Sequence, residues 1–365
     1  MSSPAALDPA RVRRLLVVRL DNLGDLVLLT PALRALRAAL PAAHVTLLAS
    51  PGGALLGPLL PWVDEVRTVR ALWQDASGGL PFDPARERAL VDELAAGAYD
   101  AAVISTSFSQ SPHPAAYACY LAGIPVRAGL AADFAGGVLS HAVPPPRDGT
   151  HQAERALALV AALGAPAAGT ALELRIPAES RVGAVAALGR AGVSGRYAVV
   201  APGASCPSRR YEAERFAAVT AGLSRTAGLD VVVVGSEGER PLAEQMAFDG
   251  RRAAGPRATV VSLAGATGVG ELAAVIDGAE LVVTNNSAPL HLADALRRPT
   301  VALFAGTERE SEYAPRDAPL RLLRRATACA PCRTLRCPYA QECLDIPADE
   351  VVAAARSLQP QPVAG

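Results

Sequence analysis

Short apolar runs alternate with longer amphipathic segments along most of this chain. Leu15–Val18 has the continuous apolar pattern of a buried parallel strand, and 32–40 has the apolar spacing of an amphipathic helix. Strands that alternate with helices predict parallel sheets, and therefore an α/β fold. In the first half we expect further strands at 44–49, 66–69 and 101–105 and a helix at 152–163.

The alternation is interrupted by a segment rich in glycine, alanine and proline, around 164–177, and then begins again. The sequence therefore predicts an N-terminal domain over 1–170, a C-terminal domain over 177–345, and a final helix and tail over 346–365. In the second half we expect strands at 197–201, 230–235, 259–262, 281–284 and 300–304, and helices from about 213, at 269–277 and at 290–296.

Composition indicates a globular protein with an ample core. Of the 365 residues, 51% are hydrophobic and 19% are charged, and the formal net charge is zero, so we expect no nucleic-acid partner. No apolar run approaches the roughly 18–20 residues of a membrane span, and the N-terminal stretch lacks the apolar segment of a signal peptide. We expect a cytoplasmic protein with at most peripheral contact at the inner face of the cytoplasmic membrane.

Lysine is absent from the chain and asparagine is rare. The lack of lysine excludes Schiff-base chemistry, and the lack of G-x-G-x-x-G, G-x-x-x-x-G-K-[ST] and G-x-S-x-G patterns disfavours nicotinamide enzymes, P-loop ATPases and hydrolases. The three asparagines, Asn22, Asn285 and Asn286, lie in two predicted loops. Either these loops need an amide side chain, or the asparagines serve only the turn geometry.

The loop after the first strand carries the candidate catalytic residue. Gly24 and Asp25 lie between the first strand and the first helix. Ligands of α/β sheets bind at the carboxyl ends of the strands, beside helix N-termini. Asp25 is therefore placed for chemistry, and the alternative is that it only caps the helix.

Polar residues also follow strands of the second half. Asn286, Ser287 and His291 lie between a strand and a helix, where hydroxyls, amides and the helix N-terminus could hold a pyrophosphate. The alternative for His291 is a structural histidine. Arg209 and Arg210 form a guanidinium pair suited to an oxyanion, or a solvated pair in a loop.

Two carboxylates, Glu237 and Glu239, follow the strand at 230–235. A carboxylate at this place could accept hydrogen bonds from a nucleotide ribose, as in doubly wound nucleotide-binding folds. The alternative is a pair of surface carboxylates.

Four of the six cysteines lie within fifteen residues. Cys329, Cys332, Cys337 and Cys343 have C-x2-C-x4-C-x5-C spacing, which resembles a thiolate site for zinc or an iron–sulfur cluster but strictly matches no common zinc finger. The alternative is a set of reduced thiols that pack a C-terminal loop.

Three segments together resemble glycosyltransferase family nine, the ADP-heptose:lipopolysaccharide heptosyltransferases. RLDNLGDLVLLTPALRALRAALP resembles the opening of the family, with its Gly-Asp and Pro-Ala-Leu groups. APGAS followed by RRYEAERF resembles its Pro-Gly-Ala and Lys-x-Trp-Pro-x-Glu segment. TNNSAPLHLADALRRPTVALFAGT resembles its Ser-Gly-Pro-x-His block.

The resemblance implies the GT-B architecture, in which two Rossmann-like domains face a central cleft. It implies acceptor binding by the N-terminal half, nucleotide-sugar binding by the C-terminal half, and a final helix at 349–358 that crosses back toward the first domain. It also implies inverting, metal-independent sugar transfer with Asp25 as general base. The donor would be ADP-heptose or a similar nucleotide sugar, and the acceptor a lipopolysaccharide-core, lipid-linked or other glycan. The residues expected at the donor are Arg209, Arg210, Glu239, Asn286, Ser287 and His291.

The sequence departs from the family pattern at the donor site. The phosphate-binding lysine of the family falls at Arg209 and its tryptophan at Tyr211, while Asn286 and Ala288 stand where an acidic residue and a glycine are common. The base and the sugar of the nucleotide-sugar donor therefore do not follow from these motifs. Two further functions remain: a non-catalytic sugar-nucleotide-binding protein on the same scaffold, and a metal or redox protein built on the cysteines.

Overall fold

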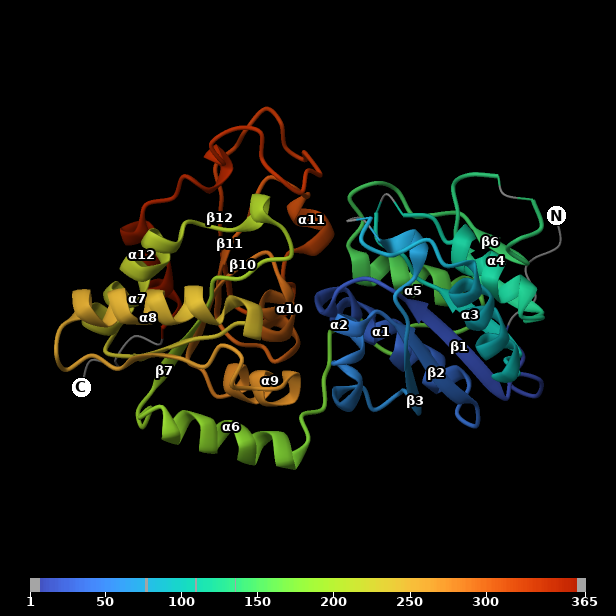
Figure 1. Ribbon diagram of the computed structural model, residues 1–365, viewed down its shortest axis with the longest axis horizontal. Helices are drawn as coiled ribbons and strands as arrows, with labels where there is room; N and C mark the ends of the chain where they lie inside the picture. Colours follow the sequence, from blue (N-terminus) through green and yellow to red (C-terminus); the bar gives the residue numbers. More distant parts are fainter. Residues whose placement is uncertain (1–6, 76–77, 109, 135, 360–365) are drawn as a thin grey trace. The chain divides into compact units, whose positions relative to one another are not determined.

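The computed structural model describes residues 7–75, 78–108, 110–134 and 136–359. Ser109 of the polar segment after the fourth predicted strand, and 360–365 of the predicted tail, lie outside the described residues. The chain divides into two compact units, Met1–Arg175 and Ile176–Gly365; in Figure 1 the first runs from blue to green and the second from yellow-green to red.

The first unit is built on a six-stranded sheet in the order β3-β2-β1-β4-β5-β6, in which every neighbouring pair is parallel. Parallel strands in this order are the arrangement of a doubly wound, Rossmann-like sheet. The strands are β1 (Arg14–Arg19), β2 (His44–Ala49), β3 (Glu65–Thr68), β4 (Ala101–Ile104), β5 (Val126–Leu130) and β6 (His141–Val143), and the helices are α1 (Leu23–Ala39), α2 (Pro51–Ala54), α3 (Pro84–Ala96), α4 (His113–Leu121) and α5 (Gln152–Ala162), with 3-10 turns η1 (Gly57–Leu59) and η2 (Leu72–Gln74).

The second unit repeats this topology, with the sheet order β12-β11-β10-β7-β8-β9 and parallel pairing throughout. The predicted α/β fold with two Rossmann-like sheets is therefore confirmed. Its strands are β7 (Tyr197–Ala201), β8 (Asp230–Val233), β9 (Val260–Ser262), β10 (Leu281–Asn285), β11 (Thr300–Leu303) and β12 (Leu320–Leu323), and its helices are α6 (Ala178–Arg190), α7 (Ala213–Ala227), α8 (Arg240–Ala254), α9 (Val269–Asp277), α10 (Ala288–Ala295), α11 (Glu310–Tyr313) and α12 (Ala348–Leu358), with 3-10 turns η3 (Pro207–Arg209), η4 (Glu237–Glu239) and η5 (Glu342–Leu344).

The first helix begins nine residues earlier than the expected 32–40. Helix α1 starts at Leu23 and includes Pro31 in its interior. Its buried face, which includes Leu26, Leu29 and Leu33, packs between the sheet and α5. Burial of this long apolar face outweighs the hydrogen bond that Pro31 cannot donate.

Register within each sheet brings particular strand ends together. Val18 of β1 pairs with Ile104 of β4, so the residues that follow these two strands meet at one edge of the first sheet. In the second sheet, Thr284 of β10 pairs with both Ala201 of β7 and Ala302 of β11. The loops after β7, β10 and β11 therefore lie side by side.

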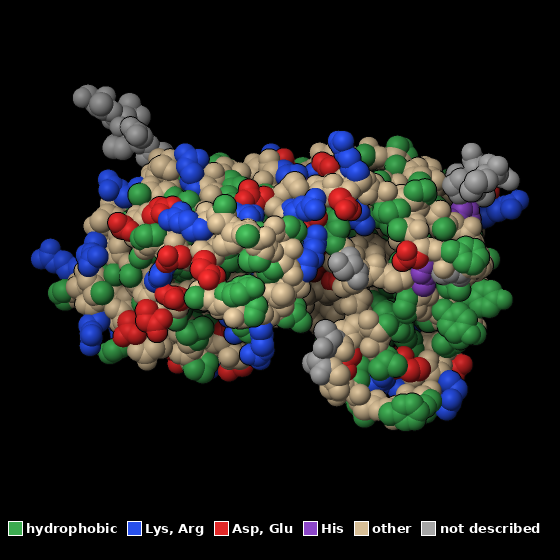
Figure 2. All heavy atoms as spheres, turned by 90° about the horizontal axis from the view of Figure 1, so that it is seen from above, with side chains coloured by type: hydrophobic (Ala, Val, Ile, Leu, Met, Phe, Trp, Pro, Cys, Tyr) green, Lys and Arg blue, Asp and Glu red, His purple; other side chains and the backbone are tan. Residues whose placement is uncertain are grey.

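The final helix, α12, packs against α7, β11 and β12 within the second unit. Val351 and Ala355 on this helix are fully buried in the core of that unit, together with Phe216 of α7. Its predicted return toward the first unit stays a prediction. On the face in Figure 2, acidic and basic side chains are intermixed over both units, as expected from a formal net charge of zero.

Candidate active site

Asp25 lies in the first turn of α1 rather than in the loop that we expected. Asn22 occupies the N-cap position, and the backbone N–H of Asp25 donates to the Asn22 carbonyl at 3.0 Å. Asp25 is therefore the third residue of the helix, and the alternative that it serves as the N-cap is wrong. A carboxylate in the first turn is favoured by the helix dipole.

A buried arginine at the end of β1 holds the Asp25 carboxylate. Arg19 is 2% exposed, and its Nη2 lies 3.2 Å from Asp25 Oδ1 while its Nε lies 2.8 Å from Asp21 Oδ2. The second contact is an ion pair without the alignment of a hydrogen bond. Burial raises the pKa of Asp21, and the positive charge of Arg19 opposes this effect. One guanidinium therefore serves two carboxylates, of which Asp25 is the more exposed.

The polar loop after β4 completes this cluster. Ser105 accepts a hydrogen bond from Arg19 Nη1 at 3.0 Å, and Ser107 accepts one from Arg19 Nη2 at 2.8 Å. We predicted the strand that precedes this loop but none of these partners. The signal was available, because a charged residue that ends an apolar strand needs a partner, and the neighbouring strand supplies it.

In the second unit, Arg209 and Asn286 meet at a residue that the sequence analysis missed, Glu308. Arg209 Nη2 forms a close ion pair with Glu308 Oε1, and Asn286 Nδ2 donates to Glu308 Oε2 at 2.6 Å. Arg209 Nε also donates to Thr307 Oγ1 at 3.1 Å. The structure thus brings together the loops after β7, β10 and β11. No described residue bonds Arg209 Nη1, so one edge of the guanidinium is left for an oxyanion.

His291 lies on α10 behind this cluster. Its ring is fully buried, and burial together with the charge of Arg209 lowers its pKa to about 4. Its Nδ1 has no hydrogen-bond partner among the described residues. Ser287 is at the N-cap position of α10, where its Oγ lies 3.4 Å from Thr284 Oγ1. His291 is therefore an uncharged neighbour of Arg209 at neutral pH.

Arg210 and Glu239 have local partners. Arg210 Nε and Nη2 bond the carbonyl oxygen of Ala204 at 3.2 and 3.1 Å, away from Glu308. Glu239 Oε2 accepts from both the N–H and the hydroxyl of Ser236 at 2.8 Å, which is a capping box at η4. A Cβ built at Gly203 would overlap the Glu239 carboxylate, so Glu239 lies directly against the Pro-Gly-Ala loop. Arg210 and Glu239 therefore have local hydrogen-bond partners that neither alternative named, and their expected donor contacts stay predictions.

The asparagine before Asn286 has a structural role. Asn285 is fully buried, its Nδ2 donates to the Pro202 carbonyl at 2.7 Å, and its Oδ1 accepts from the Tyr211 N–H at 3.1 Å. This amide therefore fixes both ends of the loop that contains Arg209.

The four C-terminal cysteines lie on one segment beside the Arg209 cluster, with Cys329 exposed and the other three half-buried. Burial raises the pKa of the Cys343 thiol, and the other three cysteines also contribute. In the described part of the chain, no three His, Cys, Asp or Glu side chains are grouped to hold a metal ion. The segment is tied to the candidate site by its backbone: the Cys332 N–H donates to Gly306 at 3.0 Å, and the Ser208 hydroxyl donates to the Thr334 carbonyl at 2.5 Å.

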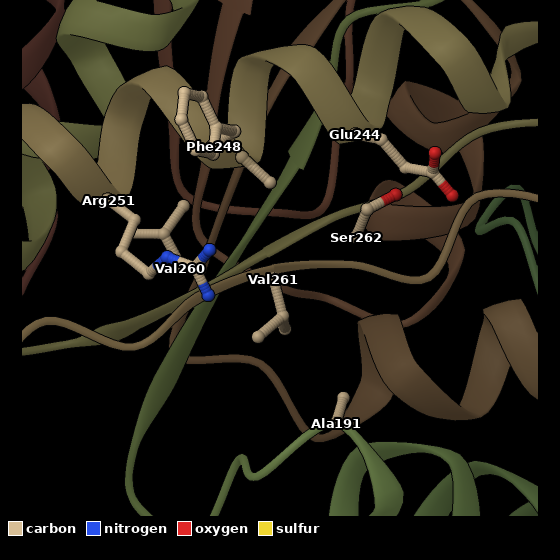
Figure 3. A pocket seen from close by; sticks show the side chains of 8 residues that line it. Ala191, Glu244, Phe248, Arg251, Val260, Val261 and Ser262 are labelled. Carbon is tan, nitrogen blue, oxygen red and sulfur yellow. The ribbon is translucent and has the colours of Figure 1, made fainter.

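A pocket of about 320 Å³ lies elsewhere in the second unit, between α8, β9 and the end of α6. Figure 3 shows Glu244, Phe248 and Arg251 from α8 on one side and Val261 from β9 on the other. None of the residues that line it is among the catalytic, donor-binding or metal-binding residues expected from the sequence. It is lined by Ala191, Glu244, Ala247, Phe248, Arg251, Val260, Val261 and Ser262.

Solved structures share the fold of this chain. The chain is 22% identical to the Escherichia coli ADP-heptose lipopolysaccharide heptosyltransferase II, with a TM-score of 0.72 over 94% of this chain and 98% of that one. A glycosyltransferase family 9 protein from Veillonella parvula gives 22% identity and a TM-score of 0.74, over 96% and 98% of the two chains. The E. coli heptosyltransferase WaaC with ADP-2-deoxy-2-fluoro heptose gives 20% and 0.67, over 94% and 99%. The chain therefore has the GT-B fold of glycosyltransferases.

The chain belongs to glycosyltransferase family 9, the heptosyltransferase family. The family model matches residues 87–342, which is more than half of the chain. No curated protein gives a significant match. Among the described residues, no helix combines the length and the apolar character that crossing a lipid bilayer requires.

Proposed function

We propose that this protein is an inverting glycosyltransferase that moves a sugar, heptose from ADP-heptose, onto a lipopolysaccharide-core or related glycan acceptor. The observation that carries the proposal is the Asp25 carboxylate, fixed by Arg19 at the carboxyl end of β1 with part of its surface open to solvent. Membership of glycosyltransferase family 9 supports the reaction class.

In the proposed reaction, an acceptor hydroxyl attacks the anomeric carbon of the donor. The bond from that carbon to the diphosphate oxygen breaks, and ADP leaves with the electron pair. Asp25 takes the proton of the attacking hydroxyl, because a neutral hydroxyl is a weak nucleophile. The new glycosidic bond lies on the opposite face of the sugar ring, so the configuration at that carbon inverts.

Arg209 is the proposed contact to the diphosphate. Glu308 and Thr307 bond Nη2 and Nε of its guanidinium, and no described residue bonds Nη1, which can therefore donate to a phosphate oxygen. Ser287 and the N-terminus of α10 offer further donors to the diphosphate, and neutral His291 and Asn286 line the same place. Arg210 and Glu239 would contact the donor only by leaving their local partners.

The proposed reaction uses no metal ion. The proposed location is the cytoplasm, with peripheral membrane contact where the acceptor is linked to a lipid. Tyr117, Tyr120 and Leu121 of α4 support that contact, because they share one helix face and are each more than half exposed. Elemental analysis of the purified protein, and turnover after chelation, test metal independence, because bound metal whose removal stops turnover would contradict it.

The test is turnover of ADP-heptose with glycan acceptors by wild type and Asp25→Asn. We expect Asp25→Asn to lower turnover about 10²–10⁴-fold, as loss of a positioned general base does, while nucleotide affinity and melting temperature change little. Glu65→Gln is the control, because it removes a carboxylate from an ion pair of the same sheet that includes neither Arg19 nor Asp25. Tight nucleotide-sugar binding without turnover would instead favour a non-catalytic binding protein.

A further inference from the structure

The two oxygens of the Asp25 carboxylate have different surroundings. Oδ1 lies 3.2 Å from Arg19 Nη2, and it accepts a hydrogen bond from Ser107 Oγ, also at 3.2 Å. No described residue donates a hydrogen bond to Oδ2. The carboxylate is therefore anchored through one oxygen and open at the other.

The direction of the Ser107 hydroxyl follows from the number of protons available. A serine hydroxyl has one proton, and an arginine can only donate. Ser107 Oγ must therefore accept from Arg19 Nη2, at 2.8 Å, and its own proton is left for a carboxylate. Its hydrogen bond to Asp25 Oδ1, at 3.2 Å, makes Asp25 one acceptor, and Asp21 is a second carboxylate beside the same hydroxyl. An oxygen that accepts from two donors cannot also take up a proton, so any proton that Asp25 receives goes to Oδ2.

Ser107 is itself held in place by a closed set of contacts. Its backbone N–H donates to Gln110 Oε1 at 3.2 Å, and Gln110 Nε2 donates to Asp21 Oδ1 at 2.6 Å. Asp21 in turn pairs with Arg19. The contacts thus run from Asp25 through Ser107, Gln110 and Asp21 to Arg19 and back to Asp25, which fixes the serine relative to the carboxylate.

We propose that Ser107 is a positioning residue for the general base: with Arg19 it holds Oδ1 of Asp25 as a hydrogen-bond acceptor, so that Oδ2 receives the proton of the acceptor hydroxyl. The inference rests on the proposed function, in which Asp25 is the base. The charged groups against Asp25 are Arg19 and Asp21 from the β1–α1 segment, whereas the β4–α4 segment contributes the uncharged Ser107 and Gln110.

The experiment compares Ser107→Ala, Ser107→Thr and, as a matched control, Ser111→Ala. Ser111 is in the same loop, but its hydroxyl contacts His113. We expect Ser107→Ala to lower kcat about tenfold, as loss of a hydrogen bond to a charged group does, with an unchanged donor KM. Because that hydrogen bond favours the ionised carboxylate, the acid limb of the pH–rate profile should also move to higher pH. Ser107→Thr keeps the hydroxyl and should restore both quantities, and Ser111→Ala should match wild type.

The outcomes separate this inference from the proposed function. A Ser107→Ala enzyme with wild-type kcat and an unmoved acid limb, beside an inactive Asp25→Asn enzyme, would overturn the role of Ser107 alone. The role of Ser107 would also be overturned if Ser107→Thr lost as much activity as Ser107→Ala. Near-normal turnover by Asp25→Asn would overturn the assignment of the base, and this inference with it. Melting temperatures of all variants show whether a loss comes from unfolding.

Discussion

Asn286 donates a hydrogen bond from its side-chain amide to the buried carboxylate of Glu308, at 2.6 Å. This contact joins the loops after β10 and β11, and Arg209 bonds the other oxygen of the same carboxylate. An amide at 286 is therefore matched to a carboxylate at 308, which gives a physical reason for asparagine where an acidic residue is common in the family.

Asn286→Asp should destabilise the second unit at neutral pH. It replaces a donor with a second carboxylate against Glu308, and an uncompensated buried charge of this kind costs about 3 kcal/mol. Thermal unfolding at pH 7.5 and pH 5.5 measures the effect, which should shrink at the lower pH as the pair takes up a proton. Glu308→Gln added to Asn286→Asp should recover part of the loss, whereas a wild-type melting temperature for Asn286→Asp would mean that the two residues do not meet in solution.

Arg209→Ala should weaken nucleotide binding. It removes a charge-assisted contact to the diphosphate worth roughly 1.5–3 kcal/mol, and Arg209→Lys should restore part of it as a point charge. Calorimetric titration with ADP measures the change. Arg210→Ala is the matched control, since Arg210 bonds the Ala204 carbonyl. If Arg210→Ala lost affinity and Arg209→Ala kept it, the two arginines would have exchanged roles.

His291 should make the stability of the protein depend on pH. Its pKa of about 4 in the folded state lies below the ordinary histidine value of 6.5, so the unfolded chain takes up the proton first as the pH falls. The contribution of His291 to the free energy of unfolding should therefore be fully present above pH 6.5 and lost as the pH falls toward 4. At roughly 1.4 kcal/mol for each pH unit, the total loss is about 3 kcal/mol. Denaturant unfolding of wild type and His291→Gln across this range measures the difference. Parallel pH dependences for the two proteins would contradict the burial of an uncharged ring.

Gly250→Ala should destabilise the packing of α7 against α8. A Cβ built at Gly250 would overlap Thr220 Oγ1 and lie 3.1 Å from its Cβ. Such overpacking costs about 1–3 kcal/mol. Thr220→Ala removes the obstructing hydroxyl. The double variant should therefore lose less free energy of unfolding than the sum of the losses in the two single variants. Gly189→Ala on α6, with open space around the new methyl, is the control and should stabilise slightly. Additive effects of the pair would show that α7 and α8 are further apart.

The sequence predicted most of the strands, including 44–49, which coincides with β2. The strand 197–201 coincides with β7, and the helix 269–277 coincides with α9. The missed strand β5 contains Arg127, which interrupts its apolar pattern. In the structure Arg127 is 7% exposed, and its guanidinium bonds the carbonyls of Ile124 and Val138. Local periodicity cannot reveal a charge whose partners come from the turns at both ends of the strand.

For the candidate site, the sequence located single residues better than their partners. Arg209 and Asn286 lie in segments that follow strands, as expected, and Asp25 lies in the first turn of the helix after β1, but their partners Arg19 and Glu308 were missed. Whether a carboxylate or a guanidinium is buried beside another charge depends on which strands are neighbours in the sheet, and that order is a tertiary property. The resemblance to a family located the motifs in the chain but did not predict which of their residues contact one another.

The segment from Cys329 to Cys343 and helix α12 have a consequence for biosynthesis. Domains fold as units and N-terminal ones first while the chain is being synthesised. All strands of the first unit have been made once Val143 is added, so that unit can fold early. The second unit lacks α12 until residues 348–358 have been made, although Arg209 and Asn286 were made long before. The loops that carry Arg209 and Glu308 are held by Cys332 and Thr334, so this half acquires its final form only after the segment 329–358 has been made. A premature stop just before α12 would therefore leave a folded first unit joined to an incomplete second one, which is a natural substrate for cellular proteases.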